Sequence, residues 1–358
     1  MAQTADQQLP QLVPRPGGSQ ARPAPLIRDE TRTALAVGLI GIVLASLFAA
    51  SLVVAVGRPR PRGVPIAAVG GAGARHAITR AFEKAAGGGI EIRIYATELG
   101  AVRAITNQRV YGAVISSERV PKLLVSSASS GSVADALKAV AEGLAARSAL
   151  KLAVDDLHPL PAGDPQGLVL LYALIATMLL GFVTTFLIQI NAPELALAQW
   201  LGCAAFLAVF GSLAVTLIVG PILGGLPGSF PALWAALAGW VAICSLIART
   251  MLALVGRFAA VPTVAFIVIL GIPSSGAAVG RPLLPAFYRA IGRWLPDGAT
   301  ADVTRTIAYF PDHQHLAPIV IETLWLVGSL AAVIAVGTMR SRRALQRDRS
   351  RREPAPAS

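Results

Sequence analysis

The chain has 358 residues, of which 54% are hydrophobic and 14% are charged, and its formal net charge is +12. This balance excludes an ordinary soluble globular protein and favours an integral membrane protein. The positive charge does not indicate nucleic-acid binding, because the sequence has no basic stripe with interleaved stacking aromatic residues.

The first predicted elements are a leader and a membrane anchor. Residues 1–31 are rich in Pro, Gln and Arg and lack an aliphatic run, so we expect a disordered leader. The apolar stretch 34–57 follows and is long enough to cross a bilayer, which takes about 20 residues. Because it is longer than the apolar part of a secretory signal peptide, we predict a retained first transmembrane helix over residues 32–57.

Residues 58–166 form a polar stretch long enough for one small domain. Patterns typical of strands and of helices alternate along it. Strands are predicted at 64–70, 90–96, 110–116, 122–127 and 150–156, and helices at 78–85, 99–105 and 133–144. This order predicts a compact α/β domain.

Five further apolar stretches predict a five-helix transmembrane region over residues 167–338. They cover 168–190, 196–220, 231–248, 254–272 and 317–338. The stretch 254–272 gives the weakest signal, because Arg257 and Pro262 interrupt it. Together with the first span, these stretches predict an α-helical polytopic membrane protein with six transmembrane helices and an α/β domain between spans one and two.

The placement of arginine predicts the orientation in the membrane. Six crossings put both termini on one side, and the basic tail 339–358 holds seven arginines just beyond the last span. Arginines also precede the first span and lie in the turn between spans four and five, on the same side by parity. By the positive-inside rule, we predict a multi-pass protein of the cell membrane with both termini cytoplasmic and the α/β domain extracellular.

The segment 273–316, between the last two spans, contains prolines, glycines and arginines that a bilayer disfavours. Apolar residues recur in it at helical spacing, at Leu284, Phe287, Tyr288, Ile291, Trp294 and Leu295. Arg289 and Arg293 lie off this face. We predict an extracellular amphipathic or re-entrant helix that acts as an outer lid and packs its apolar face, with Trp294, against lipid or the span bundle. A second short helix over 302–310 is expected to return the chain to the last span.

Glu322 is the only carboxylate within the six predicted spans. An acid inside a membrane is expensive unless it is paired or faces water, so Glu322 is a candidate functional residue. The alternative is a structural ion pair with an arginine of the outer segment, such as Arg281, Arg289 or Arg293. The turn formed by Pro273, Ser274, Ser275 and Gly276 is a further candidate, and its simpler interpretation is a turn that ends a helix.

The remaining motifs do not predict an enzyme, a cofactor or a metal. The turn 69–77 follows a predicted strand as a dinucleotide-binding loop would, but His76 stands where a third glycine is needed. Asp312, His313 and His315 are too few for a metal site, and no nucleophile elbow surrounds the serine turn. No lysine follows a glycine, as the phosphate-binding loop of an ATPase requires, so any ATP hydrolysis takes place on another subunit.

The order of these segments resembles the YhgE/Pip (phage infection protein) branch of the type-2 ABC exporter permeases, which is common in Gram-positive bacteria. The resemblance covers most of residues 30–340 and includes the paired half-helices between the last two spans. Its local motifs are YGAVIS (111–116), SSASSG (126–131), DPQG (164–167), GIPSSG (271–276), PLLPAFYRAIGRWLPDGA (282–299) and YF (309–310). The chain departs from the family at Ile272, where Asn is common, and at Ala277, where a second glycine is common.

The resemblance implies the permease subunit of an ABC-type export system, working as a homodimer or heterodimer with a separate ATPase. It also implies that the turn 191–195, with Pro193 and Glu194, contacts that ATPase. Two alternatives stay open: a non-transporting surface protein, such as a phage receptor or a secretion-apparatus component, and a proton-coupled carrier that uses Glu322. The carrier hypothesis is the weaker one, because the predicted spans contain no second acid or histidine to form a relay.

Overall fold

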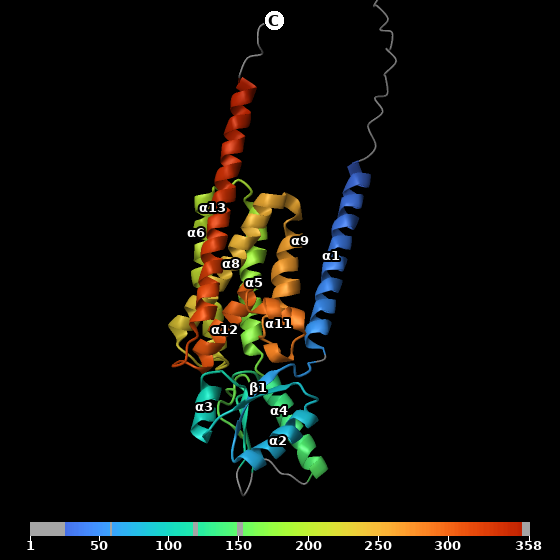
Figure 1. Ribbon diagram of the computed structural model, residues 1–358. Helices are drawn as coiled ribbons and strands as arrows, with labels where there is room; N and C mark the ends of the chain where they lie inside the picture. Colours follow the sequence, from blue (N-terminus) through green and yellow to red (C-terminus); the bar gives the residue numbers. More distant parts are fainter. Residues whose placement is uncertain (1–25, 58, 117–120, 149–152, 353–358) are drawn as a thin grey trace, which may run out of the picture. The chain divides into compact units, whose positions relative to one another are not determined.

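The computed structural model describes residues 26–57, 59–116, 121–148 and 153–352 (Figure 1). The chain divides into two compact units, residues 1–43 and 44–358, and each is described by itself. Residues 1–25 of the predicted leader and residues 353–358 of the predicted tail lie outside the described residues. Helix α1 (Leu26–Val56) contributes to both units, and all further elements belong to the second.

The second unit contains an α/β domain whose strands and helices occupy the predicted segments. The strands are β1 (Val64–Val69), β2 (Ile90–Ile94), β3 (Gly112–Ile115), β4 (Lys122–Val125) and β5 (Ala153–Asp156), and the helices are α2 (Ala72–Ala85), α3 (Glu98–Thr106) and α4 (Gly131–Ser148). The sheet order is β2-β1-β3-β4-β5. Only the β3–β4 neighbours are antiparallel among the strand pairs of the described chain.

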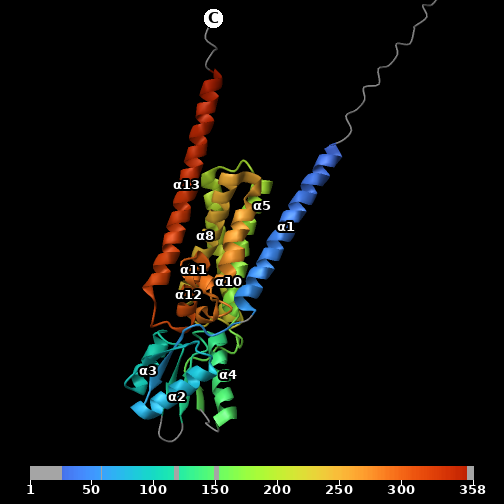
Figure 2. The same ribbon diagram turned by 45° about the vertical axis from the view of Figure 1, so that its right-hand side comes forward.

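Helices cover both faces of this sheet, which explains why its central strands are apolar throughout. Ile66 of β1 packs in one core with residues of α2 and α4, such as Phe82 and Leu137. Its neighbour Ala67 points to the other face and packs with Ile105 of α3. Figure 1 shows α2 and α4 side by side and α3 apart from them, and Figure 2 shows the same domain turned by 45°.

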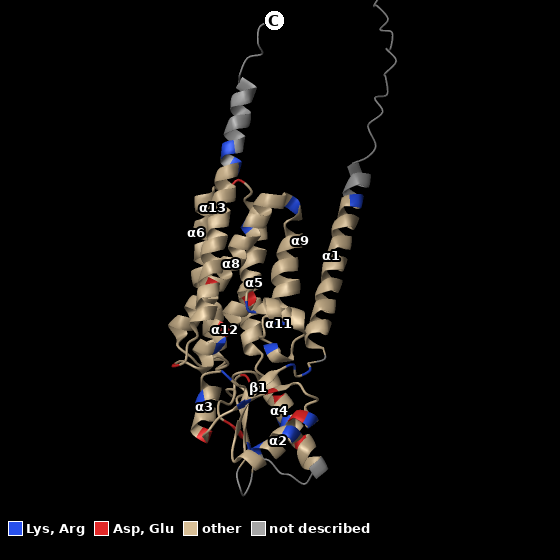
Figure 3. Cartoon of the chain, in the orientation of Figure 1, with Lys and Arg blue, Asp and Glu red and all other residues tan. Residues whose placement is uncertain are grey.

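Five helices of the described chain are long and apolar enough to cross a membrane, which agrees with the predicted helical membrane protein. These candidate spans cover Thr31–Val56, Val169–Asn191, Leu197–Ile222, Phe230–Phe258 and Leu316–Arg340. The first, second and last of these spans lie in α1, α5 (Val169–Asn191) and α13 (Leu316–Arg352). The third consists of α6 (Leu197–Phe206), η1 (Leu207–Gly211), α7 (Ser212–Leu217) and η2 (Ile218–Ile222). The fourth consists of α8 (Phe230–Val255) and η3 (Gly256–Phe258). Charged residues are sparse along these helices and frequent in the α/β domain (Figure 3).

The fifth predicted span, 254–272, is shorter in the structure than its apolar run. The helix before it ends at Gly256, whose φ of 61° breaks the helical backbone, so the next apolar helix covers only Ala260–Ser274. This helix consists of α9 (Ala260–Thr263), the π-helix η4 (Val264–Gly271) and α10 (Ile272–Ser274). A six-span count therefore depends on a helix below the usual spanning length.

The segment after α10 forms a shorter helix than the amphipathic one predicted between Pro285 and Pro296. It forms η5 (Arg281–Leu283), α11 (Ala286–Gly292) and α12 (Pro296–Tyr309). Leu284 has extended backbone because it precedes Pro285, so it does not share a helical face with Phe287. Leu284 is buried, whereas 57% of Phe287 and 62% of Trp294 are exposed. Leu284 therefore lies outside the predicted helical face.

Helix α13 continues beyond its predicted span as far as Arg352. The composition of residues 339–352 predicts a disordered basic tail, but its Arg, Ala, Leu and Gln residues are also good helix formers that extend an existing helix.

Candidate functional site

The segment from Gly271 to Ala299 connects the α/β domain to the helices. Leu283, Leu284 and Tyr288 pack in the same apolar core as the α2–α4 face of the sheet. The Arg62 amide donates a hydrogen bond to the Pro282 carbonyl at 3.0 Å. The Gly280 amide donates to the Ser132 hydroxyl of α4, also at 3.0 Å. The segment therefore anchors the α/β domain as well as covering the helices.

Arg289 serves this same contact and does not reach Glu322. Its guanidinium donates to the backbone carbonyl of Arg62. Arg293 lies over the ring of its neighbour Trp294, with 5.8 Å between the guanidinium carbon and the ring centre. The backbone carbonyl of Trp294 accepts a hydrogen bond from the Trp325 indole of α13 at 2.8 Å. Arg289 and the Trp294 carbonyl thus contact other parts of the chain, whereas the ring contact of Arg293 is with its neighbour.

The turn Pro273–Gly276 has a structural explanation for each of its polar groups. The Ser274 hydroxyl donates to the Leu270 carbonyl at 2.6 Å, and the Ser275 hydroxyl donates to the Ile272 carbonyl at 2.8 Å. Gly276 has a φ of 76°, in the left-handed region that favours glycine, and its carbonyl accepts from Arg305 at 2.6 Å. These contacts satisfy the carbonyls at the end of a broken helix.

A cluster of three charges lies where α12 meets the α/β domain. Asp302 forms ion pairs with Arg281 and Arg305 through its two carboxylate oxygens. These residues and Tyr111, which follows α3, line a cavity of about 180 Å³. Burial raises the pKa of the Tyr111 hydroxyl above its ordinary value. The cluster is a structural ion network, and it occupies Arg281, one of the arginines expected as a partner for Glu322.

Glu322 is buried and pairs with a hydroxyl group, so the expected ion pair with an arginine is not formed. The Thr300 hydroxyl of α12 donates to Glu322 Oε1 at 3.1 Å. The same oxygen faces Gly239 of α8, where an added Cβ would lie 3.4 Å away. Only 8% of Glu322 is exposed, and no described ion pair includes it. Glu322 stays a candidate functional residue, and its partner in the structure is Thr300 in place of an arginine.

Asp297 is a second buried acid that sequence reasoning missed. It lies in the first turn of α12, and 3% of it is exposed. Its carboxylate packs against Gly271 so closely that an added Cβ there would be 2.2 Å from Oδ2. Oδ2 has no hydrogen-bond partner among the described residues, and burial raises the pKa of Asp297 well above its usual range. The signal for Asp297 was absent from the sequence because it lies outside every apolar run.

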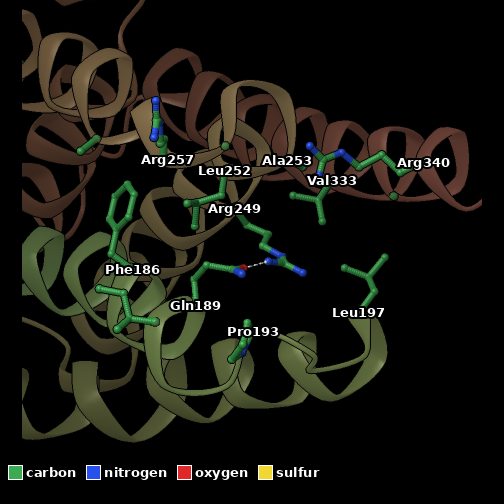
Figure 4. Close-up of a pocket in the computed structure, with 14 residues that line it drawn as sticks. Phe186, Gln189, Pro193, Leu197, Arg249, Leu252, Ala253, Arg257, Val333 and Arg340 are labelled. Atoms are coloured by element: carbon green, nitrogen blue, oxygen red, sulfur yellow. Dashed lines mark hydrogen bonds between the residues drawn. The ribbon is translucent and has the colours of Figure 1, made fainter. Parts of the chain in front are cut away.

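A cavity of about 650 Å³ opens at the end of the helices where α5 finishes and α6 begins. Arg249 of α8, Arg257 of η3 and Arg340 of α13 line it together with apolar side chains (Figure 4). Arg249 donates to the Gln189 side chain and lies 5.5 Å from the centre of the Trp200 ring. None of the three arginines forms an ion pair within the part of the chain that the structure describes. The cavity is therefore apolar and positively charged.

The turn between α5 and α6 forms one wall of this arginine-lined cavity. Pro193 lines the cavity, and Glu194 is exposed beside it. The Asn191 side chain donates to the Leu187 carbonyl at 2.8 Å, and the Leu195 amide donates to the Ala192 carbonyl at 3.2 Å. These bonds fix a short turn in which the Glu194 side chain is exposed.

The glycine-rich turn after β1 is explained by close packing. Gly70 has a φ of 137°, and an added Cβ would lie 2.6 Å from Ser116 Cβ at the end of β3.

Across the described residues, no group of three or more His, Cys, Asp and Glu side chains could hold a metal ion. Comparisons of the chain with protein-family models, with curated proteins and with solved structures gave no match.

Proposed function

We propose that this chain is the membrane-spanning permease subunit of an ABC-type export system and that a separate ATPase subunit drives it. The observation that carries the proposal is the arginine-lined cavity beside the α5–α6 turn. It offers a concave, positively charged recess next to an exposed carboxylate, which suits a docking subunit with complementary charge. The other end of these helices is occupied by the α/β domain.

The proposed orientation places the cavity in the cytoplasm and the α/β domain outside the cell. It is supported by the arginines at the cavity and in the basic tail, because cytoplasmic ends of spans are enriched in Arg and Lys. In this orientation α11 and α12 lie at the outer ends of the helices, and a dimer of permease subunits would enclose the export pathway.

The orientation can be tested with cysteines introduced at two exposed acids. Glu142 of α4 and Glu194 are both exposed, so a membrane-impermeant maleimide can reach either from its own side. With Cys203 and Cys244 replaced by Ala, Glu142→Cys should react in intact cells, and Glu194→Cys should react only after permeabilisation. Labelling of both positions in intact cells would contradict the orientation.

The role of the α5–α6 turn can be tested by co-purification of ATP hydrolysis. The tagged chain is isolated from its native membranes in mild detergent, and vanadate-sensitive ATPase activity is measured in the eluate. Glu194→Arg should lower this activity several-fold at an unchanged amount of permease, because it reverses the only charge of the turn. Glu142→Arg, a matched reversal in the α/β domain, should have no effect.

Two outcomes of this experiment would argue against the proposal. Absence of ATPase activity from the wild-type eluate would favour the alternative of a non-transporting surface protein that binds partners through the α/β domain. Equal activity for Glu194→Arg and the wild type would remove the α5–α6 turn from the contact with the ATPase.

A further inference from the structure

Two buried acids lie on the neighbouring helices α12 and α13. Asp297 of α12 contacts Gly271, near the end of the short apolar helix Ala260–Ser274. Asp297 and Thr300 are three residues apart on α12, which places their Cβ atoms about 5–6 Å from each other on one helix face. The Thr300 hydroxyl is 3.1 Å from Glu322 Oε1. Thr300 is therefore a neighbour of Asp297 along α12 and the hydrogen-bond partner of Glu322, and all three side chains are at least nine-tenths buried.

The surroundings of the two acids are closely packed and apolar. Gly271 of η4 contacts the Asp297 carboxylate, and Gly239 of α8 faces Glu322. An added Cβ at Gly292 would lie 2.0 Å from the Ser274 carbonyl oxygen, and one at Gly298 would lie 1.8 Å from the Gly292 carbonyl oxygen. Such close backbone contact leaves no room there for bulky side chains.

No cation within the described residues neutralises these acids. Arg281 and Arg305 are both paired with Asp302. Arg281 also donates to the Gly298 carbonyl at 2.9 Å, and Arg305 to the Gly276 carbonyl. The other titratable and charged groups on the packed elements are Cys244 and Arg249 of α8, Tyr288 and Arg289 of α11, Asp302, Arg305 and Tyr309 of α12, Arg281 of η5, and Arg293 just after α11.

The donors available to the two acids are also too few for two negative charges. Glu322 receives the Thr300 hydroxyl, whereas Asp297 Oδ2 has no partner among the described residues. The Thr304 hydroxyl, one turn beyond Thr300 on α12, is fully buried and likewise has no partner. A buried carboxylate without a cation is costly by several kcal/mol, and such a group takes up a proton instead.

We propose that Asp297 and Glu322, together with Thr300, form a proton-binding site inside the helices. In its resting state the site holds at least one proton, which either carboxyl group can carry. This inference does not depend on the proposed function, because proton binding is measured on the permease chain without an ATPase. It supplies the second acid whose absence had weakened the carrier hypothesis.

Proton binding can be measured by infrared difference spectroscopy during a pH titration of the purified full-length protein. Wild-type protein should show the carbonyl band of a protonated carboxylic acid at pH 7. Asp297→Asn and Glu322→Gln should each remove part of this band. Asp312→Asn replaces an exposed acid, and it should leave the band unchanged.

The coupling between the two acids separates a proton site from a merely structural pair. In Asp297→Asn, the band that remains should titrate at a lower pH, because loss of a neighbouring negative charge favours ionisation of Glu322. Glu322→Gln should shift the Asp297 band in the same direction. Unchanged titration in both variants would overturn the proposal.

Two further results bear on the proposal without any variant. Loss of the wild-type band with sodium chloride, but not with choline chloride, would show a sodium site in place of a proton site. Dicyclohexylcarbodiimide reacts with protonated carboxyl groups in apolar surroundings, so mass spectrometry of the treated wild type should find the adduct on Asp297 or Glu322. Adducts on exposed acids alone would overturn the proposal, as would absence of the band at pH 7.

Discussion

The contact between the α/β domain and the segment before α11 gives a direct test of the packing. Leu284 is fully buried in the core that also contains β1 and α2, whereas 57% of Phe287, three residues later, is exposed. Truncating a buried Leu to Ala costs about 2–5 kcal/mol, because the lost contacts leave a cavity. At about 2 °C per kcal/mol, Leu284→Ala should lower the melting temperature by about 4–10 °C.

Phe287→Ala is the matched control for this prediction, since it removes a larger apolar side chain from the same segment. Its effect should be smaller than that of Leu284→Ala, because the aromatic ring loses few protein contacts. Both variants can be compared by the tryptophan fluorescence of the purified protein during heating. Hydrogen exchange of the Arg62 amide, which donates to Pro282, should become faster only in Leu284→Ala.

A greater loss of stability in Phe287→Ala than in Leu284→Ala would contradict this packing. It would mean that the continuous amphipathic face predicted from the sequence exists. Unchanged protection of the Arg62 amide in Leu284→Ala would mean that the segment does not anchor the α/β domain.

Three further predictions use the same melting measurement. Asp302→Ala should lower the free energy of unfolding by more than about 1 kcal/mol, because it leaves two partly buried arginines unpaired. Glu91→Ala breaks an exposed ion pair and should lower it less, so equal losses would contradict the prediction. Gly276→Ala should cost about 1–2 kcal/mol because its φ is 76°, and Gly328→Ala, in open space on α13, should be neutral or stabilising. Burial lowers the pKa of His158, so the unfolded chain binds a proton at this residue before the folded chain does. The free energy of unfolding should therefore fall as the pH drops below about 6.5. His158→Gln should make this dependence on pH less steep, and an unchanged dependence would contradict the role of His158.

Much of the architecture follows from short-range patterns in the sequence. Short apolar runs and apolar spacing located each strand and helix of the α/β domain, because a buried strand is apolar throughout and a half-buried element repeats its apolar face every two or 3.6 residues. Uninterrupted apolar runs located the five long helices, since a helix that crosses the hydrocarbon core of a bilayer needs such a run. Glu322 was identified for the same reason, as a charge within an apolar run.

The tertiary structure decided which residues of the connecting segment are buried. A helical wheel places Leu284 and Phe287 on one face, but Pro285 interrupts the helix between them, so their burial differs. Asp297 belongs to a polar stretch with proline and glycine neighbours, and its burial arises only because α12 packs against Gly271, distant in sequence. The partners of Arg281, Arg289 and Glu322 were likewise set by long-range packing, which sequence spacing along one segment does not encode.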